Sequence, residues 1–418
     1  MKRISLILVV FSSFTTTSVS AQIQTAHQFS PEYRYYQTRI YSKLTQNLNE
    51  RNSYQYYLDK AQEHLQNNQL ESALLDYEKA IQILPLSPVA YNYRGAVYGE
   101  LKLWQLAMRD FNKAIELNRE YANAYYHRAL IYHTLNKFDL ALLDFNKTIE
   151  LEPNQISAYN YRGSIFLKQN KFQSALKDYN KAIALDSNNS YYYNNRGLVY
   201  YNLRKYHLAL ADYNHAIKLN PQDSRFYVNR AVLSQELADF ASAITDCNQA
   251  IQLNPQDATA FMTLGFSYQQ FNQFDLALDN FNRAIALDPY FAKAYLNRAA
   301  LYETFNNNDL ALKDYNQAIS LAPNLAKAYN NRGNFYRQQN QLSLAITDFK
   351  RAIEINPSLA MYYRNLGLIW QKLNEPELAI QYLKIAAQLF KIQNNLQEYQ
   401  TVLQFLSQLN FVLENNPE

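Results

Sequence analysis

A 34-residue repeat runs through most of this 418-residue chain. When the sequence is written in rows of 34 that begin at Tyr54, ten rows align without an insertion or a deletion. We number the positions within a row as columns 1 to 34. Column 20 is alanine in all ten rows, column 27 is alanine in nine, and seven of the eleven prolines fall in column 32. A fixed period of about 20–50 residues indicates a solenoid or a similar repeat array.

The columns also predict what each row folds into. Columns 4, 8 and 11 are almost always apolar or small, and so are columns 20, 24, 27 and 28. Steps of three and four place such residues on one face of an α-helix, so each row should form two amphipathic helices. The proline in column 32 ends the second helix. Small residues in columns 8, 20 and 27 allow the two helices to approach, with Tyr or Phe in columns 4, 11 and 24 around that contact. One such hairpin cannot bury its apolar face alone, so the rows must stack.

This pattern resembles the tetratricopeptide repeat (TPR) family, in which aromatic, small, Tyr, Ala, aromatic, Ala and Pro residues recur at these intervals. The resemblance implies an all-α fold, a right-handed superhelical α-solenoid of helix-turn-helix hairpins. One departure is column 7, which is usually Leu in the family and is Arg in seven rows here. The ten predicted repeats are 54–87, 88–121, 122–155, 156–189, 190–223, 224–257, 258–291, 292–325, 326–359 and 360–393.

The first 21 residues have the layout of a secretory signal peptide. Lys2 and Arg3 precede the short apolar run Ile4–Phe11, and small residues follow up to Ala21. This order of charged start, apolar segment and small residues predicts cleavage after Ala21. The alternative is an uncleaved membrane anchor, but a spanning helix needs about 20 apolar residues. We therefore expect an extracytoplasmic protein, periplasmic or secreted, with no membrane span after cleavage.

Residues 22–53 form an N-terminal extension before the repeats. Within it, Pro31–Leu48 is predicted to form a helix that covers the first repeat, because a proline stands near its start. The alternative is a disordered linker. Apolar or aromatic residues recur in this segment at steps of three and four, at Tyr33, Tyr36, Ile40 and Leu44.

The C-terminal end is predicted to close the array with residues 394–418, as a capping helix and tail. In the tenth row Lys391 replaces the column 32 proline, so the second helix should be longer there and cover 374–392. Solenoids need a terminal element that shields the last apolar face. The residues expected on the packing face of the cap are Leu396, Tyr399, Leu403 and Leu406.

Arginine in column 7 occurs together with aspartate in column 23 of the same row. The two rows that lack the cation, with Leu264 and Leu366 in column 7, also lack the acid and carry Asn280 and Tyr382. Pairing across rows fails, since Asp246 would then face Leu264. We interpret the pattern as an ion pair within each hairpin; the alternative is a set of arginines that bind phosphate or carboxylate groups. The predicted pairs are Arg94–Asp110, Arg128–Asp144, Arg162–Asp178, Arg196–Asp212, Arg230–Asp246, Arg298–Asp314 and Arg332–Asp348.

The sequence carries no catalytic or metal-binding motif. There is no Gly-rich phosphate loop, no H-E-x-x-H motif and no pair of cysteines. The single cysteine, Cys247, stands in column 24 and is expected to be a buried packing residue. His127 and His133 share a first helix but are six residues apart, which does not place them on one face. The net charge of +4 is dispersed and shows no basic stripe for nucleic acid. We therefore expect no enzyme activity, no cofactor and no metal.

Column 6 supplies the candidate binding residues. In the TPR family the first helices line a concave groove, and column 6 points into it. The asparagines of the later rows resemble the asparagine ladder of O-linked N-acetylglucosamine transferases, which holds an extended peptide. A carboxamide donates and accepts, so it can pair with any peptide backbone. The alternative is that asparagine is merely tolerated on an open helix face. The predicted groove residues are Tyr93, His127, Tyr161, Asn195, Asn229, Asn297, Asn331 and Asn365.

Two functions from different classes follow from this surface. The first is a non-enzymatic scaffold that binds an extended segment of a partner protein in the groove. The second is a glycan-binding accessory of polysaccharide export or cell-envelope assembly, because the first half of the groove is rich in tyrosine, and rings also stack on sugars. The sequence does not identify the partner or the oligomeric state.

Overall fold

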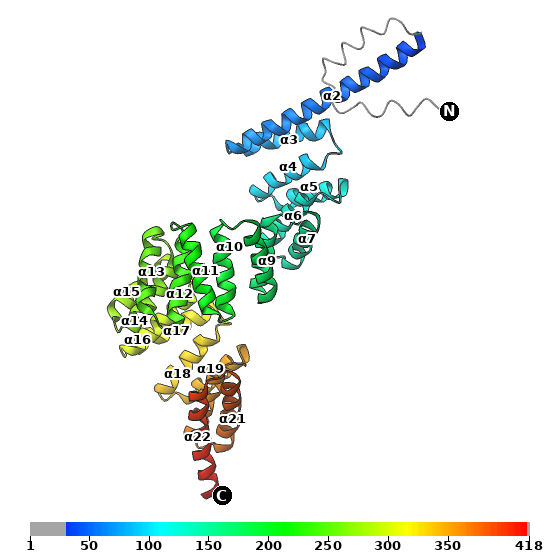
Figure 1. Cartoon of the computed structure of the whole chain (residues 1–418). Helices are drawn as coiled ribbons and strands as arrows, with labels where there is room; N and C mark the ends of the chain where they lie inside the picture. The colour runs from blue at the N-terminus through cyan, green and yellow to red at the C-terminus, as the bar shows by residue number, and fades with distance from the viewer. Residues whose placement is uncertain (1–30, 416–418) are drawn as a thin grey trace. The chain divides into compact units, whose positions relative to one another are not determined.

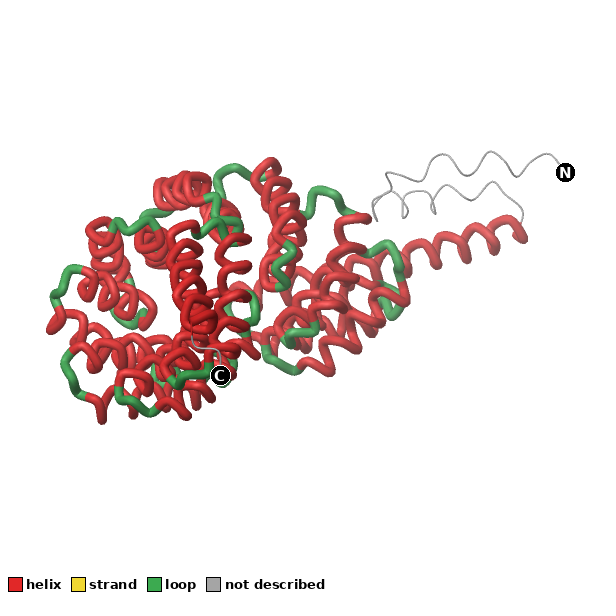
Figure 2. Tube along the Cα trace, turned by 90° about the horizontal axis from the view of Figure 1, so that it is seen from below, coloured by secondary structure: helices red, strands yellow, loops and turns green. Residues whose placement is uncertain are grey.

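The computed structural model of the protein describes residues 31–415, and the predicted signal peptide lies outside them. Within the described range the chain forms 21 helices and no strand (Figure 2). Consecutive helices pack against each other as pairs, one pair for each 34-residue row. The predicted all-α architecture of helical hairpins is confirmed. The hairpins fall into two compact units that divide after Asn188.

The first unit contains hairpins 1 to 4. Its helices are α2 (Pro31–Gln66), α3 (Leu70–Ile83), α4 (Pro88–Glu100), α5 (Trp104–Leu117), α6 (Ala122–Thr134), α7 (Phe138–Leu151), α8 (Ile156–Lys168) and α9 (Phe172–Leu185).

The second unit contains hairpins 5 to 10 and the C-terminal helix. Its helices are α10 (Ser190–Asn202), α11 (Tyr206–Leu219), α12 (Ser224–Glu236), α13 (Phe240–Leu253), α14 (Ala258–Gln270), α15 (Phe274–Leu287), α16 (Ala292–Thr304), α17 (Asn308–Leu321), α18 (Ala326–Gln338), α19 (Leu342–Ile355), α20 (Ala360–Lys372), α21 (Pro376–Ile392) and α22 (Leu396–Asn415).

The N-terminal extension is not a separate helix. Residues 31–53 continue without a break into the first helix of hairpin 1, which makes α2 36 residues long. No glycine or proline occurs between Glu32 and Gln66, so nothing in this segment ends the helix. In Figure 1, α2 is the long blue helix, and α3 lies along its C-terminal part.

A tight turn in column 15 separates the two helices of every hairpin. The residue there has a positive φ in all ten hairpins, for example 58° at Lys102. The backbone N–H of Leu103 donates to Tyr98 at 2.8 Å, and that of Lys102 donates to Gly99 at 3.0 Å. These two bonds define a Schellman motif, which uses the last carbonyls of the first helix. Asparagine fills column 15 in most rows because it tolerates left-handed backbone better than other side chains do.

The core lies between the two helices of each hairpin and continues into the next hairpin. In hairpin 3, Ala129, Ala141 and Phe145 from columns 8, 20 and 24 are fully buried. Ala158 and Ile165 of hairpin 4 pack against them. Stacking therefore uses columns 3 and 10, and the small residues of columns 8 and 20 set the helix spacing. The spacing is close: a Cβ placed on Gly197 in hairpin 5 would lie 2.7 Å from the ring of Tyr213.

The C-terminal helix α22 covers the last hairpin with a face that matches the predicted one in part, since Leu406 is buried and Tyr399 packs beside it as predicted. Val402, Leu406 and Leu409 are buried against Ala386 and Phe390 of α21. Leu396 and Leu403, which were expected to pack, are 65% and 42% exposed. The apolar residues of α22 allow two neighbouring helix faces, and contact with α21, which extends to Ile392, selects the one that carries Val402.

Candidate interaction site

Column 6 of the first helices is half-buried in most hairpins of both units. In hairpins 2 to 4 it holds rings, and each ring packs on a column 24 ring of the preceding hairpin. Tyr161 stacks on Phe145 with centroids 5.9 Å apart and an interplanar angle of 4°. His127 stacks on Phe111 at 5.8 Å, and Tyr93 lies 5.9 Å from Tyr77. One face of each predicted groove ring is therefore used to join two hairpins.

A second set of contacts links column 6 to column 5 of the preceding hairpin. Asn229 Nδ2 donates to Asn194 Oδ1 at 2.8 Å, and Asn365 Nδ2 donates to Asn330 Oδ1 at 2.9 Å. The same step joins Asn297 Nδ2 to the sulfur of a column 5 methionine at 3.4 Å. In the second unit, three of the column 6 asparagines thus tie one first helix to the one before it. This role was not predicted from the sequence. A signal was available, because an asparagine in column 5 is followed 35 residues later by the asparagine in column 6 to which it is bonded.

His127 repeats this contact in the first unit with an imidazole. Its Nδ1 lies 2.9 Å from Asn92 Oδ1, so Nδ1 is the donor and the ring is held in one tautomer. Tyr126 packs against the ring at a centroid distance of 5.4 Å. Burial lowers the pKa of His127 to about 4, because desolvation disfavours the charged imidazolium. The imidazole is neutral at pH 7 and serves as a structural hydrogen-bond donor.

The structure brings each of the seven column 7 arginines to its column 23 aspartate. Each pair is bidentate, as in hairpin 2, where Arg94 Nε and Nη2 donate to the two oxygens of Asp110 at 2.7 and 3.0 Å. The Arg196–Asp212 pair in hairpin 5 has the same form at 2.8 and 2.7 Å. The exposed fraction of the arginine side chains ranges from 9% in Arg94 to 25% in Arg230. The Lys60–Asp76 contact of the first hairpin is looser, at 4.0 Å.

Two further contacts of the arginines were not foreseen from the sequence. The third nitrogen, Nη1, donates to the column 25 asparagine of the preceding hairpin, as from Arg298 to Asn282 at 2.7 Å. The rings of columns 4 and 11 flank the guanidinium, as Tyr295 and Tyr302 do at 5.5 and 5.7 Å from Arg298. The sequence contained a signal for the bond to asparagine, because column 25 is asparagine in seven consecutive rows. The same arginine–asparagine bond is made by the pairs Arg128–Asn112, Arg162–Asn146, Arg230–Asn214 and Arg332–Asn316.

In these five hairpins the cluster therefore joins three helices. The aspartate fixes the two helices of one hairpin, and the asparagine fixes the preceding second helix. In hairpin 5 the hydrogen bonds that Arg196 donates to Asp212 raise the pKa of the guanidinium, and this outweighs the opposing effect of desolvation. The charge of the arginine is thus used within the fold. In hairpin 10 the partly buried ring of Tyr382 packs against buried Leu366, which is the apolar form of the same contact.

Metal-binding side chains do not gather on these surfaces in the part of the chain that the structure describes. Over residues 31–415, no group of three or more His, Cys, Asp or Glu side chains is placed to hold a metal ion. Cys247 is fully buried, and burial raises the pKa of its thiol. None of the helices in this range is both long and apolar enough to cross a lipid bilayer.

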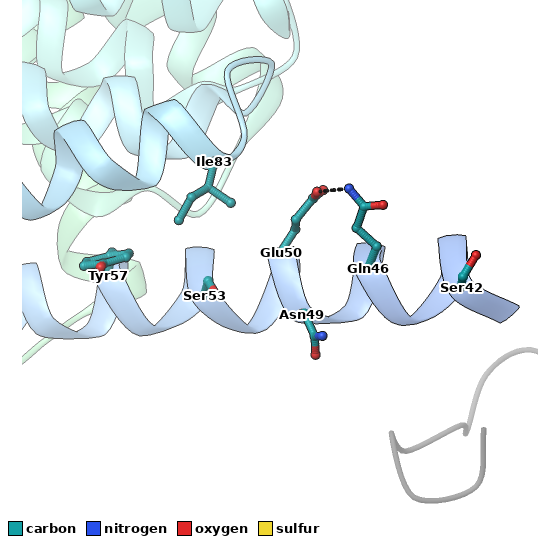
Figure 3. Close-up of a pocket in the computed structure, with 7 residues that line it drawn as sticks. All are labelled: Ser42, Gln46, Asn49, Glu50, Ser53, Tyr57 and Ile83. Carbon is teal, nitrogen blue, oxygen red and sulfur yellow. Dashed lines mark hydrogen bonds between the residues drawn. The ribbon is translucent and has the colours of Figure 1, made fainter. Parts of the chain in front are cut away.

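A shallow hollow lies beside α2, where that helix passes the end of α3. Figure 3 shows mostly polar side chains of α2 around it, with Ile83 of α3 on the opposite side. Gln46 donates to Glu50 of the same helix at 3.0 Å. Glu50 is the only carboxylate among the residues that line it. Its lining residues are Ser42, Gln46, Asn49, Glu50, Ser53, Tyr57 and Ile83.

Comparison with protein families finds the repeat along most of the chain. Models described as tetratricopeptide repeat match residues 122–155, 190–223 and 326–359, and a second model of that description matches 54–85, 224–257, 258–291 and 292–325. A model described as TPR repeat matches residues 163–203. Together these matches cover more than half of the chain. No curated protein sequence gives a significant match.

Solved structures show the same fold at low sequence identity. A tetratricopeptide repeat protein from Parabacteroides merdae is 22% identical, with a TM-score of 0.52, over 59% of this chain and 98% of that one. Yeast Tom70 is 16% identical, with a TM-score of 0.50, over 86% of this chain and 96% of that one. The matched repeats, the helical hairpins and these neighbours agree on an all-α repeat solenoid, and the chain belongs to the tetratricopeptide repeat family.

Proposed function

We propose that this protein is a non-enzymatic scaffold, exported from the cytoplasm, which binds an extended segment of a partner protein along its first helices. The family supports the general role, because tetratricopeptide repeats serve as protein–protein interaction scaffolds. The observation that carries the specific proposal is the row of column 6 asparagines in the second unit, which Thr263 interrupts in hairpin 7. Four of them are half-buried, namely Asn195, Asn229, Asn297 and Asn331, and Asn365 is buried.

The spacing of the first helices suits an extended peptide. In the second unit α10, α12, α14, α16, α18 and α20 each contact the next helix of this series directly. Packed helices lie about 8–10 Å apart, and an extended chain advances about 3.3 Å per residue, so each hairpin meets roughly every third residue. Six hairpins would thus hold a segment of roughly 18 residues.

The asparagines keep hydrogen-bonding capacity for such a peptide. A carboxamide has two N–H donors and an acceptor oxygen. In Asn229 and Asn365, one N–H donates to the preceding hairpin. The remaining donor and the oxygen can pair with a peptide backbone whatever its side chains are. Asn365 is only 7% exposed, so Asn195 and Asn331 are the better residues for a test.

The test uses a displayed library of 18-residue peptides selected on the wild-type protein. The dissociation constant of the best peptide is then measured by fluorescence anisotropy. We expect Asn195→Ala with Asn331→Ala to weaken binding by about tenfold or more, because two hydrogen bonds of about 1 kcal/mol each are lost. The matched control is Asn248→Ala, which makes the same change on the exposed face of α13 and should leave the affinity unchanged.

Two outcomes would contradict the proposal. If the double variant and the wild type bind the peptide with equal affinity and have equal melting temperatures, the asparagines do not contact the peptide. Binding on a glycan array in the absence of any peptide ligand would instead support the glycan-binding accessory. That alternative has less support, because Tyr93 and Tyr161 each stack one ring face on a core ring, which leaves only one face for a sugar.

Export is the second part of the proposal and rests on residues 1–21 alone. The charged, apolar and small-residue segments stand in the order that signal peptidases require. We expect the exported protein to begin at Gln22. Intact-mass measurement of protein recovered from the extracytoplasmic fraction tests this, with deletion of residues 2–21 as the control that stays in the cytoplasm. A chain that retains residue 1 outside the cytoplasm would contradict cleavage.

A further inference from the structure

Hairpin 6 lacks a ring that the other hairpins possess. Column 11 is Tyr, Phe or Trp in eight rows and His64 in the first, but it is Ser234 in the sixth. In five other hairpins this ring covers one face of the column 7 guanidinium. In hairpin 5, Arg196 lies between Tyr193 and Tyr200, with its central carbon 5.5 and 5.8 Å from the two centroids. Flanking rings on both sides are also found around Arg94, Arg162, Arg298 and Arg332.

Arg230 of hairpin 6 is covered on one side only. Tyr227 of column 4 lies 5.8 Å from its central carbon, and a serine stands where the second ring would be. The Arg230 side chain is 25% exposed, compared with 20% for Arg196 and 17% for Arg298. Arg230 is therefore the most exposed of the seven paired arginines, and it alone among them has no ring in column 11.

A cavity of about 450 Å³ occupies this position. That volume falls within the range of about 300–1,000 Å³ found for ligand pockets. One wall is α11 of hairpin 5, and the other wall is hairpin 6 itself. Ser234 is 6% exposed and lies at the bottom. The residues on which the argument depends are Leu210, Asn214, Arg230, Ser234, Thr245 and Asp246.

The charges around the cavity select a neutral ring over an anion. Arg230 donates from Nε and Nη2 to Asp246 at 2.8 and 2.7 Å, and from Nη1 to Asn214 at 2.6 Å. Asp246 balances the charge of the arginine, and Asp239 adds a further negative charge to the lining. A carboxylate or phosphate would meet repulsion, whereas the face of an aromatic ring is attracted to the guanidinium without competing for its hydrogen bonds.

We propose that the cavity beside Ser234 is a binding site for a tyrosine side chain of a partner protein. The protein itself supplies the argument for this occupant, because four of the other hairpins place a column 11 tyrosine, Tyr98, Tyr200, Tyr302 or Tyr336, against the same kind of cluster. The bound ring would stack on Arg230 opposite Tyr227 and bury its edges against Leu210 and Thr245. The site does not involve column 6 and does not depend on the proposed peptide groove.

The first test uses p-cresol, which is the side chain of tyrosine as a free molecule. Its binding is measured by ligand-observed NMR, with 4-methylcyclohexanol as the saturated control. We expect p-cresol to bind the wild type about tenfold more tightly than the control does, since only the aromatic ring gains the cation–π contact. The variant Ser234→Tyr fills the cavity from within and should reduce p-cresol binding by at least about tenfold.

A matched gain-of-site variant makes the test independent of damage to the fold. Tyr200→Ser in hairpin 5 opens the equivalent space beside Arg196, so adding it to Ser234→Tyr should restore p-cresol binding. Leu210→Phe fills the original cavity from α11 and serves in place of Ser234→Tyr if that variant does not fold. Equal p-cresol binding by the wild type and either filled variant would overturn the proposal, and so would equal binding of the saturated alcohol.

The partner is tested with displayed random peptides selected on the wild type and counter-selected on Ser234→Tyr. Enrichment of tyrosine in the surviving peptides supports the site, and its absence overturns the assignment of a tyrosine occupant. The column 6 double variant Asn195→Ala with Asn331→Ala should keep full p-cresol binding. Failure of the peptide groove and failure of this cavity are therefore distinguishable.

Discussion

At the residue scale, the arginine clusters show how a charge is kept inside a helical repeat. Arg196 is bidentate to Asp212 and lies between two tyrosine rings, so its removal leaves the aspartate buried without its cation. An uncompensated buried charge costs about 3 kcal/mol or more, whereas replacement of both partners by apolar groups is often neutral. Hairpin 10, with Leu366 and Tyr382, is a natural example of the apolar pair.

Arg196→Leu should accordingly lower the free energy of unfolding of the second unit by about 3 kcal/mol. Adding Asp212→Tyr should recover most of that loss, since the pair then matches hairpin 10. Urea denaturation monitored by circular dichroism measures both values. Equal midpoints for the single and the double variant would show that the ion pair does not hold the hairpin together.

His127 makes the first unit sensitive to pH. Its pKa is about 4 in the folded protein, below the usual value of about 6.5, so the unfolded chain binds the proton more strongly. Its contribution to the free energy of unfolding is complete above pH 6.5 and is lost as the pH falls from 6.5 through 4. The loss amounts to about 3 kcal/mol at pH 4.

His127→Asn should remove this dependence, because asparagine at the equivalent position of hairpin 6, Asn229, makes the same bond to column 5. The difference in melting temperature between the variant and the wild type is measured at pH 7 and pH 4.5. We expect the variant to gain relative stability at the lower pH. A constant difference between the two pH values would show that His127 is not the titrating group.

At the element scale, the turns between helices contain stored strain at a few defined positions. Ala238 has φ of 58° in a Schellman motif, with its N–H donating to Gln235 and the N–H of Asp239 donating to Ser234. A left-handed conformation costs an L-residue roughly 1–2 kcal/mol, and glycine avoids this cost. The same turn holds asparagine in most other hairpins.

Ala238→Gly should therefore stabilise the second unit by about 0.5–1 kcal/mol, after the entropy of the unfolded chain is included. The control is Ala241→Gly, an identical substitution three residues later inside α13, which should destabilise by about 1 kcal/mol. Chemical denaturation of the two variants gives both numbers. Loss of stability in both would mean that the turn carries no strain at Ala238.

The helices themselves could be predicted from the sequence because each column repeats ten times. The apolar steps of three and four define every hairpin, and the proline in column 32 marks the end of seven of them. A repeated column averages out local exceptions such as Thr148. The terminal elements are single, so this averaging is missing. At the C-terminus the pattern favoured Leu403 for the packing face, but Val402 is the buried residue, since packing against α21 decides between two adjacent faces.

The candidate site could be predicted less completely than the fold. A correlation within one row, such as arginine in column 7 with aspartate in column 23, is visible in a single sequence. Contacts between rows are harder to find, because the partner residue stands in a different column of the neighbouring row. The stacking of Tyr161 on Phe145 and the bond from Asn365 to Asn330 were both missed for this reason. These contacts reassign part of the predicted groove to the support of the fold.

At the scale of the whole molecule, a repeat array is stabilised mainly by contacts between neighbours, so its ends are its weakest points. The second unit closes with α22, which covers Ala386 and Phe390 of hairpin 10 with Val402, Leu406 and Leu409. Without α22 that apolar surface meets water. Hairpin 10 then has a packing partner on one side only, which is hairpin 9.

A chain that ends at Gln393 should therefore lose the stability of its last hairpin and keep that of the distant ones. Hydrogen exchange measured by mass spectrometry should show faster exchange in α20 and α21, with α12 and α13 unchanged, because coupling acts only between neighbouring repeats. The full chain with Val402→Asp provides a second test, since a carboxylate in the same contact disrupts the cap without shortening the chain. Uniform acceleration across the second unit would instead mean that hairpins 5 to 10 unfold as one cooperative body, with stability shared along its whole length.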